Sequence, residues 1–103
     1  MRISAEQIAT IKQLTTKFFG GQSVVRLFGS RLNDNARGGD YDFAIETDAI
    51  DARLIWSKRI KLLAELSLSE AFGDQKIDIV IVRRKINQTA PIYDQICITG
   101  VIL

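Results

Sequence analysis

The spacing of apolar residues along the chain predicts a series of helices and short strands. After Ser4, apolar residues recur every three or four positions, which is the period of an α-helix with one buried face. Ser4 and Gln7, three residues apart, form a capping box for the first turn of this helix, and Gly20 and Gly21 end it. Its predicted buried face consists of Ile8, Ile11, Leu14, Phe18 and Phe19.

Three further runs have the composition of β-strands. Residues 24–28 are rich in strand-forming residues and stop at Gly29. Residues 30–39 form a turn-rich loop with a short helical turn at its start. In residues 40–46, Tyr41, Phe43 and Ile45 alternate with polar residues, so the two sets lie on opposite faces of a strand. Residues 76–82 form the strongest strand, because every odd position is isoleucine.

A long helix is predicted between the last two strands. Asp51 can cap it, it extends to about Ala71, and Gly73 stops it. Arg59 falls near the centre of its apolar arc, so its guanidinium must pair with an acid, contact a ligand or extend past the packing into water. The predicted arc consists of Ala52, Ile55, Trp56, Ile60, Leu62, Leu63 and Leu66.

The order of elements predicts an α+β (mixed α/β) fold for a single domain over residues 1–103. We expect a small open mixed sheet with helices packed on one side. Pro91 begins a last predicted helix that ends near Thr99. The apolar chain end, residues 96–103, is predicted either to pack in the core or to contact a partner.

The composition excludes several classes of protein and of catalytic mechanism. The chain has 103 residues, 47% of them hydrophobic, and no apolar run approaches the roughly 20 residues that span a bilayer. The N-terminus lacks an apolar signal core, and the single cysteine, Cys97, excludes an internal disulfide, so we expect a cytoplasmic protein. The absence of histidine excludes Ser-His-Asp triads and histidine general bases, and a net charge of +2 gives little reason to expect nucleic-acid binding.

Three carboxylates on the predicted strands are candidate metal ligands. Asp40 and Asp42 emerge from the same face of one strand, roughly 6–7 Å apart. If the strand carrying Asp78 lies beside it, the three acids converge, and carboxylates without histidine suit Mg²⁺ or Mn²⁺. The alternative is that Asp40 and Asp42 lie on a solvated face and that Asp78 merely sits near a strand end.

Gly29 and Ser30 are candidate phosphate-binding residues at the end of the first strand. Glycine lets the backbone approach a ligand, a hydroxyl can donate, and N–H groups at a helix start favour phosphate oxygens. Arg31 and Arg37 either add phosphate contacts or remain solvated. The chain contains neither a GxxxxGK[ST] nor a GxGxxG motif.

The combination of Gly29, Ser30 and Arg31 with the later strand acids resembles the polymerase-β nucleotidyltransferase superfamily, and the short chain resembles its minimal nucleotidyltransferases (MNT). The resemblance implies a polymerase-β-like fold and transfer of a nucleoside monophosphate, with AMP from ATP expected, to a hydroxyl, with release of pyrophosphate. It implies that Gly29, Ser30 and Arg31 hold the triphosphate. Asp40, Asp42 and Asp78 would then be the catalytic residues and the ligands of Mg²⁺ or Mn²⁺. Gly39 departs from the common family form, which often has serine there.

The resemblance also implies a partner. Many MNT proteins pair with a HEPN-domain protein, in some cases as a toxin–antitoxin pair in which AMP is added to a tyrosine of the toxin. The chain itself has room for little beyond the triphosphate, so we expect the acceptor hydroxyl to come from a partner protein. Association into a homo-oligomer is a further alternative.

Two alternatives remain open. The chain is either the enzyme or a non-catalytic binding subunit, an antitoxin that caps a partner through its apolar C-terminal tail. A metal-dependent nuclease built on the same acids would need a basic groove bearing aromatic residues, whereas Lys and Arg here are scattered except at residues 83–85.

Overall fold

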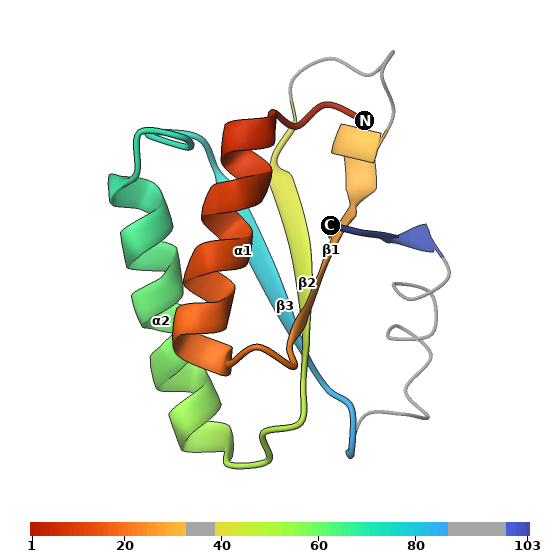
Figure 1. The fold of residues 1–103 in the computed structure, drawn as a ribbon, viewed down its shortest axis with the longest axis vertical. Helices are drawn as coiled ribbons and strands as arrows, with labels where there is room; N and C mark the ends of the chain where they lie inside the picture. Colours follow the sequence, from red (N-terminus) through yellow and green to blue (C-terminus); the bar gives the residue numbers. More distant parts are fainter. Residues whose placement is uncertain (33–38, 87–98) are drawn as a thin grey trace.

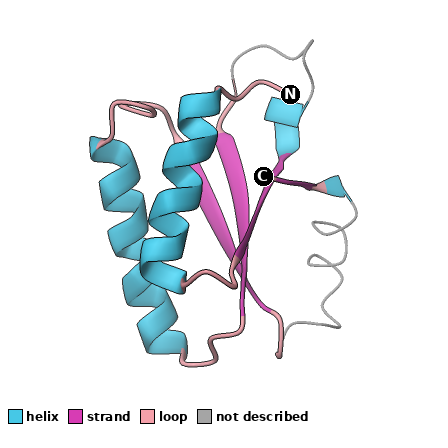
Figure 2. Ribbon diagram, in the orientation of Figure 1, coloured by secondary structure: helices cyan, strands magenta, loops and turns pink. Residues whose placement is uncertain are grey.

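The computed structural model describes residues 1–32, 39–86 and 99–103, and its fold is α+β, as predicted (Figure 2). Neither helix in this part of the chain has the length and apolar content needed to cross a bilayer. The elements are α1 (Ala5–Phe19), β1 (Val24–Phe28), the 3₁₀ turn η1 (Gly29–Leu32), β2 (Tyr41–Thr47), α2 (Ala52–Leu68), β3 (Ile77–Arg83) and β4 (Val101–Ile102).

The described strands form one open mixed sheet in the order β3-β2-β1-β4. Strand β1 pairs antiparallel with both β2 and β4, whereas β2 and β3 are parallel and are connected through α2. Figure 1 shows α1 and α2 side by side on the same face of this sheet. The predicted architecture, an open mixed sheet with helices packed on one side, is confirmed.

The core lies between the helices and the odd-numbered side chains of β2 and β3. Tyr41, Phe43 and Ile45 are buried on this face, as the alternation predicted, and Phe72 meets the Tyr41 and Phe43 rings edge-on. The opposite face of β2 is not simply solvated, since Ala44 is fully buried and Glu46 nearly so. The central core cluster comprises Ile11, Val25, Leu27, Tyr41, Phe43, Ile45, Leu62, Leu66, Phe72 and Ile79.

Helix α2 differs from the prediction in length and in its buried face. It begins after the Asp51 cap, as expected, but ends at Leu68, because the Ser69 hydroxyl donates to the Leu66 carbonyl and turns the chain. Trp56 and Ile60 were predicted to be buried but are 60% and 50% exposed. Only a narrow stripe of α2 faces the sheet and α1, so the outer part of the predicted arc remains in water.

The chain end contributes a strand that the sequence analysis missed. Val101 and Ile102 pair with Leu27 and Arg26 of β1, and the Leu103 amide donates to the Val25 carbonyl at 2.9 Å. Leu103 packs against the core, whereas Val101 and Ile102 keep exposed side chains. The rest of the predicted last helix lies outside the described residues.

Gln7 joins the first turn of α1 to the start of β2. The predicted capping box is present: the Ser4 amide donates to Gln7 Oε1, and the Gln7 amide donates to Ser4 Oγ. The Gln7 side-chain Nε2 then donates to the Tyr41 hydroxyl at 2.9 Å and to the Ala71 carbonyl at 3.0 Å. The capping residue therefore also fixes the strand end that carries the acids.

Two leucines near the end of α2 test this description of the core. Leu66 is fully buried and Leu68 is 86% exposed. Leu66→Ala is expected to lower the free energy of unfolding by about 2–5 kcal/mol, because it leaves a cavity. Leu68→Ala should change it by less than about 0.5 kcal/mol. Urea unfolding followed by circular dichroism measures both, and equal losses would contradict the packing described.

Candidate active site

The predicted acids are brought to one place by the register of β2 and β3. Asp42 lies directly opposite Asp78 in this parallel pair. Directly opposed residues of neighbouring strands point to the same face, with the strands about 4.8 Å apart. Asp40 immediately precedes β2 and is two residues from Asp42, so all three acids belong to the face away from the helices. Asp78 is near a strand end, as the alternative reading held, but it is beside Asp42 rather than apart from it.

The acids interact electrostatically. The pKa of Asp42 is raised above its ordinary value of 3.8, chiefly because burial disfavours the charged form. The negative charges of Asp78 and Asp40 raise the pKa of Asp42 further, whereas the positive charge of Lys76 lowers it. Asp42 therefore lies between the other two acids and is affected by the charge of each.

Each outer acid has its own cation. Asp40 Oδ2 lies 3.6 Å from Lys76 Nζ, and Asp78 Oδ1 lies 3.6 Å from Arg59 Nη2. The side chains of Asp40 and Asp78 are 44% and 59% exposed. Within the described ranges, no three acid or thiol side chains are grouped closely enough to hold a metal ion as they stand. The acids are neighbours in the sheet, and each of the outer two lies beside a cation of its own.

The turn η1 lies against Asp42. Gly29 has a φ of +76°, and a Cβ added to it would come within 2.5 Å of Asp42 Oδ2. Gly39 has a φ of +92°, and a Cβ there would collide with the Ser30 hydroxyl oxygen. Gly29, Ser30, Gly39 and Asp42 are therefore contiguous. Glycine at position 39, where the resembled family often has serine, follows from this close approach and from its left-handed backbone.

The Arg31 side chain contacts other residues of the protein around the turn. Its guanidinium lies over the Tyr41 ring at 4.0 Å, and its Nη2 donates to the Gly39 carbonyl at 3.1 Å. Its Nε is buried and finds no hydrogen-bond partner in the part of the chain that the structure describes. Arg37 lies outside the described residues.

Two cations near the site were missed by the sequence analysis. The Arg2 amide donates to the Arg31 carbonyl and its Nη2 donates to the Ser30 carbonyl, so the chain start braces η1. Nothing in the local pattern indicates this long-range contact. Lys76 precedes Asp78 by two positions, and the period of a strand would have indicated a charge on the same side as the acids.

Arg59 reaches the acids from α2. Of the three fates predicted for its guanidinium, pairing with an acid is the one observed, and it also donates through Nε to the Ile79 carbonyl at 2.8 Å. Beside it, an open groove of about 470 Å³ runs between α2 and the outer edge of β3. The groove is lined by Ala52, Ile55, Trp56, Arg59, Asp78, Ile79, Val80, Ile81 and Arg83.

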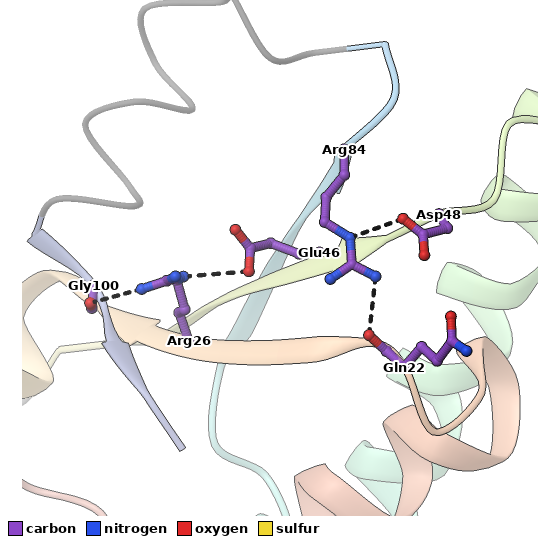
Figure 3. A network of polar contacts seen from close by, with 6 residues as sticks. All are labelled: Gln22, Arg26, Glu46, Asp48, Arg84 and Gly100. Atoms are coloured by element: carbon purple, nitrogen blue, oxygen red, sulfur yellow. Dashed lines mark hydrogen bonds and ion pairs between the residues drawn. The ribbon is translucent and has the colours of Figure 1, made fainter.

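A separate polar network occupies the other end of the strands (Figure 3). Arg26 lies between Glu46 and the Gly100 carbonyl, and Arg84 lies between Asp48 and the Gln22 carbonyl. Glu46 is four residues along β2 from Asp42, or about 13 Å. These charges pair with one another and brace the strand ends, so they are not part of the acid cluster.

The residues present fit a divalent cation by their chemistry. Three carboxylates and a neighbouring hydroxyl are the hard oxygen donors that Mg²⁺ and Mn²⁺ prefer. The raised pKa of Asp42 reflects burial and repulsion between neighbouring carboxylates, which a bound cation relieves. To bind one ion together, Asp40 and Asp78 would have to exchange contact with Lys76 and Arg59 for contact with the metal.

The raised pKa of Asp42 predicts the direction in which its substitution changes the free energy of unfolding. Because its pKa is higher in the folded chain than in the unfolded one, the ionised carboxylate opposes folding at neutral pH. With EDTA present, Asp42→Asn is expected to raise the free energy of unfolding at pH 7 by about 0.5 kcal/mol, a size typical of partly exposed charges. This gain should fade as the pH falls through the raised pKa toward 3.8. As a matched change, Asp48→Asn removes the partner of Arg84 and should lower stability in urea unfolding; a loss of stability in Asp42→Asn would contradict the electrostatics described.

Comparison with models of known protein families finds no match for this chain. A search of curated proteins finds no match either. The family resemblance in the sequence therefore remains a prediction, and the function rests on the acids, the glycine turn and their surroundings.

Proposed function

We propose that this protein is a divalent-metal-dependent nucleotidyltransferase that transfers a nucleoside monophosphate from a nucleoside triphosphate to a hydroxyl group. The observation that carries the proposal is the pairing of Asp42 with Asp78 across two parallel strands, with Asp40 two residues away and Gly29 against Asp42. Phosphoryl-type transfer asks a protein mainly for positioning and for neutralisation of charge. A carboxylate cluster beside a glycine turn provides the parts for both.

Asp40, Asp42 and Asp78 would hold the metal in this proposal. The bound ions would neutralise the triphosphate and the charge that develops on the departing pyrophosphate. Asp42 is the central ligand, because its carboxylate is next to both other acids and forms no ion pair with a described residue.

Gly29, Ser30 and Arg31 would bind the triphosphate. Gly29 has no side chain, so a phosphate can approach the backbone next to Asp42, where a Cβ would not fit. The Ser30 hydroxyl is exposed and can donate to a phosphate oxygen. The Arg31 guanidinium, held beside Gly39, would add a positive charge to the same turn.

Asp78 is suited to receive the acceptor. Its side chain is 59% exposed and borders the open groove, so a hydroxyl from outside can reach it. In the proposed step the hydroxyl oxygen bonds to the α-phosphorus, the bond from that phosphorus to the bridging oxygen breaks, and pyrophosphate leaves. The hydroxyl proton passes to the Asp78 carboxylate.

We further propose ATP as the donor and a HEPN-type protein in the cytoplasm as the acceptor, on the basis of the resemblance alone. Exposed apolar residues on α2 support a protein partner: Leu54, Trp56 and Ile60 are at least half exposed, and Leu68 is 86% exposed. The alternative of a non-catalytic subunit that binds through its tail has less surface available, since β4 pairs with β1 and Leu103 packs inward.

Substitution of an acid in the cluster tests the proposed activity. We expect the chain to transfer label from α-³²P-ATP with Mg²⁺ to its HEPN-type partner, and Asp42→Asn to reduce this transfer at least about 100-fold. Asp48→Asn, an equal change at an exposed acid outside the cluster, should keep wild-type transfer. Unchanged transfer by Asp42→Asn would overturn the enzyme, and full silencing of the partner by that variant would support the binding subunit instead.

Substitution of two glycines that both have positive φ tests the proposed phosphate contact. Gly29 and Gly20 both have positive φ, but a Cβ at Gly20 meets nothing within 4 Å. Gly29→Ala and Gly20→Ala should each lower stability by at least about 1–2 kcal/mol from backbone strain, and Gly29→Ala by more, because its Cβ would also displace the Asp42 carboxylate. Only Gly29→Ala is expected to weaken binding of a non-hydrolysable ATP analogue, by about tenfold or more, the size of one lost charge-assisted contact. Isothermal titration calorimetry measures this affinity, and equal affinities in the two variants would refute the assignment of Gly29.

A further inference from the structure

Three contacts hold the Arg59 guanidinium beside the Asp78 carboxylate. Its Nε donates to the Ile79 carbonyl at 2.8 Å, its Nη2 lies 3.6 Å from Asp78 Oδ1, and its guanidinium lies 5.4 Å from the centre of the Trp56 ring. Its side chain is only 22% exposed, whereas that of Asp78 is 59% exposed. The arginine therefore has more contacts with its surroundings than the acid, which is the more exposed member of the pair.

The backbone of β3 explains how an arginine from α2 reaches an acid on the other face of the sheet. The Lys76 carbonyl and the Arg84 amide bond to β2, so the even-numbered backbone groups point inward. The Ile79 carbonyl points the other way, along the outer edge of β3, with which no described strand pairs. Arg59 crosses this edge, and the rigid fork of its guanidinium directs the remaining N–H groups at Asp78.

We propose that Arg59 is a positioning residue that sets the orientation of the Asp78 carboxylate. This inference rests on the proposed nucleotidyltransferase function. By holding Oδ1, Arg59 leaves the second carboxylate oxygen for the metal or for the acceptor proton. Its positive charge also opposes a cation bound to the same carboxylate, so it orients Asp78 at a cost in metal affinity.

Removing Arg59 should therefore strengthen metal binding and slow nucleotide transfer. These opposite changes distinguish a positioning role from simple structural support. Arg59→Gln is expected to bind Mn²⁺ about 3–10-fold more tightly, because a nearby positive charge is removed, and to transfer nucleotide about tenfold more slowly, because Asp78 is no longer oriented. Arg59→Lys keeps the charge, so its Mn²⁺ affinity should stay within about twofold of wild type. Its transfer should still fall, since one ammonium cannot replace the fork.

Trp56 provides a readout that does not depend on turnover. It is the single tryptophan of the chain, and Arg59 connects it to Asp78. Titration with Mg²⁺ alone should change its fluorescence in the wild-type chain. The change should be lost in Arg59→Gln and in Asp78→Asn, because the contact between the metal site and the indole is broken.

The complete experiment measures Mn²⁺ affinity by electron paramagnetic resonance, Trp56 fluorescence with Mg²⁺ and transfer rate, with thermal melting to verify folding. Arg53→Gln, a change of the same type at an exposed position on α2, is the control and should match wild type in all of these. Mn²⁺ binding that depends on Asp42 and Asp78 but is no tighter in Arg59→Gln would overturn the role of Arg59 alone. An absence of Asp42-dependent Mn²⁺ binding in the wild-type chain would overturn the proposed function itself, and with it this inference.

Discussion

The parallel, in-register pairing of β2 with β3 is the constraint on which the candidate site depends. This pairing places Asp42 beside Asp78 and turns the odd-numbered side chains toward the helices. A slip of one residue would move Asp78 into the core and an isoleucine to the acid face. Because Phe43, Ile45 and Ile79 are buried by the same register, the packing energy of the core also holds the acids together.

The ionised Asp42 carboxylate lowers the stability of the folded chain. Burial and neighbouring charges raise the pKa of Asp42, so its ionised form is disfavoured in the folded chain. Lys76 and Arg59 offset part of this repulsion at the two outer acids. In the proposed function a divalent cation would take the place of these two side chains at the acids, and the surrounding core tolerates the remaining repulsion.

Sequence patterns predicted what depends on local periodicity. The capping box at Ser4, the Asp51 cap and the alternation in β2 all follow from spacing within a few residues. Contacts between distant segments were not accessible in this way. The pairing of residues 101–102 with β1 and the bracing of η1 by Arg2 each depend on where separate elements meet. The exposure of Trp56 and Ile60 shows the same limit, because the width of a buried stripe is set by the neighbours of the helix rather than by its own sequence.

The contact between Gly39 and Ser30 links two positions that are far apart along the loop. A side chain at residue 39 would occupy the space of the Ser30 hydroxyl, and the left-handed backbone at Gly39 already disfavours one. Residues 30 and 39 are therefore expected to vary together during evolution: a lineage that acquires serine at position 39 must rotate the hydroxyl at position 30 or rebuild the turn.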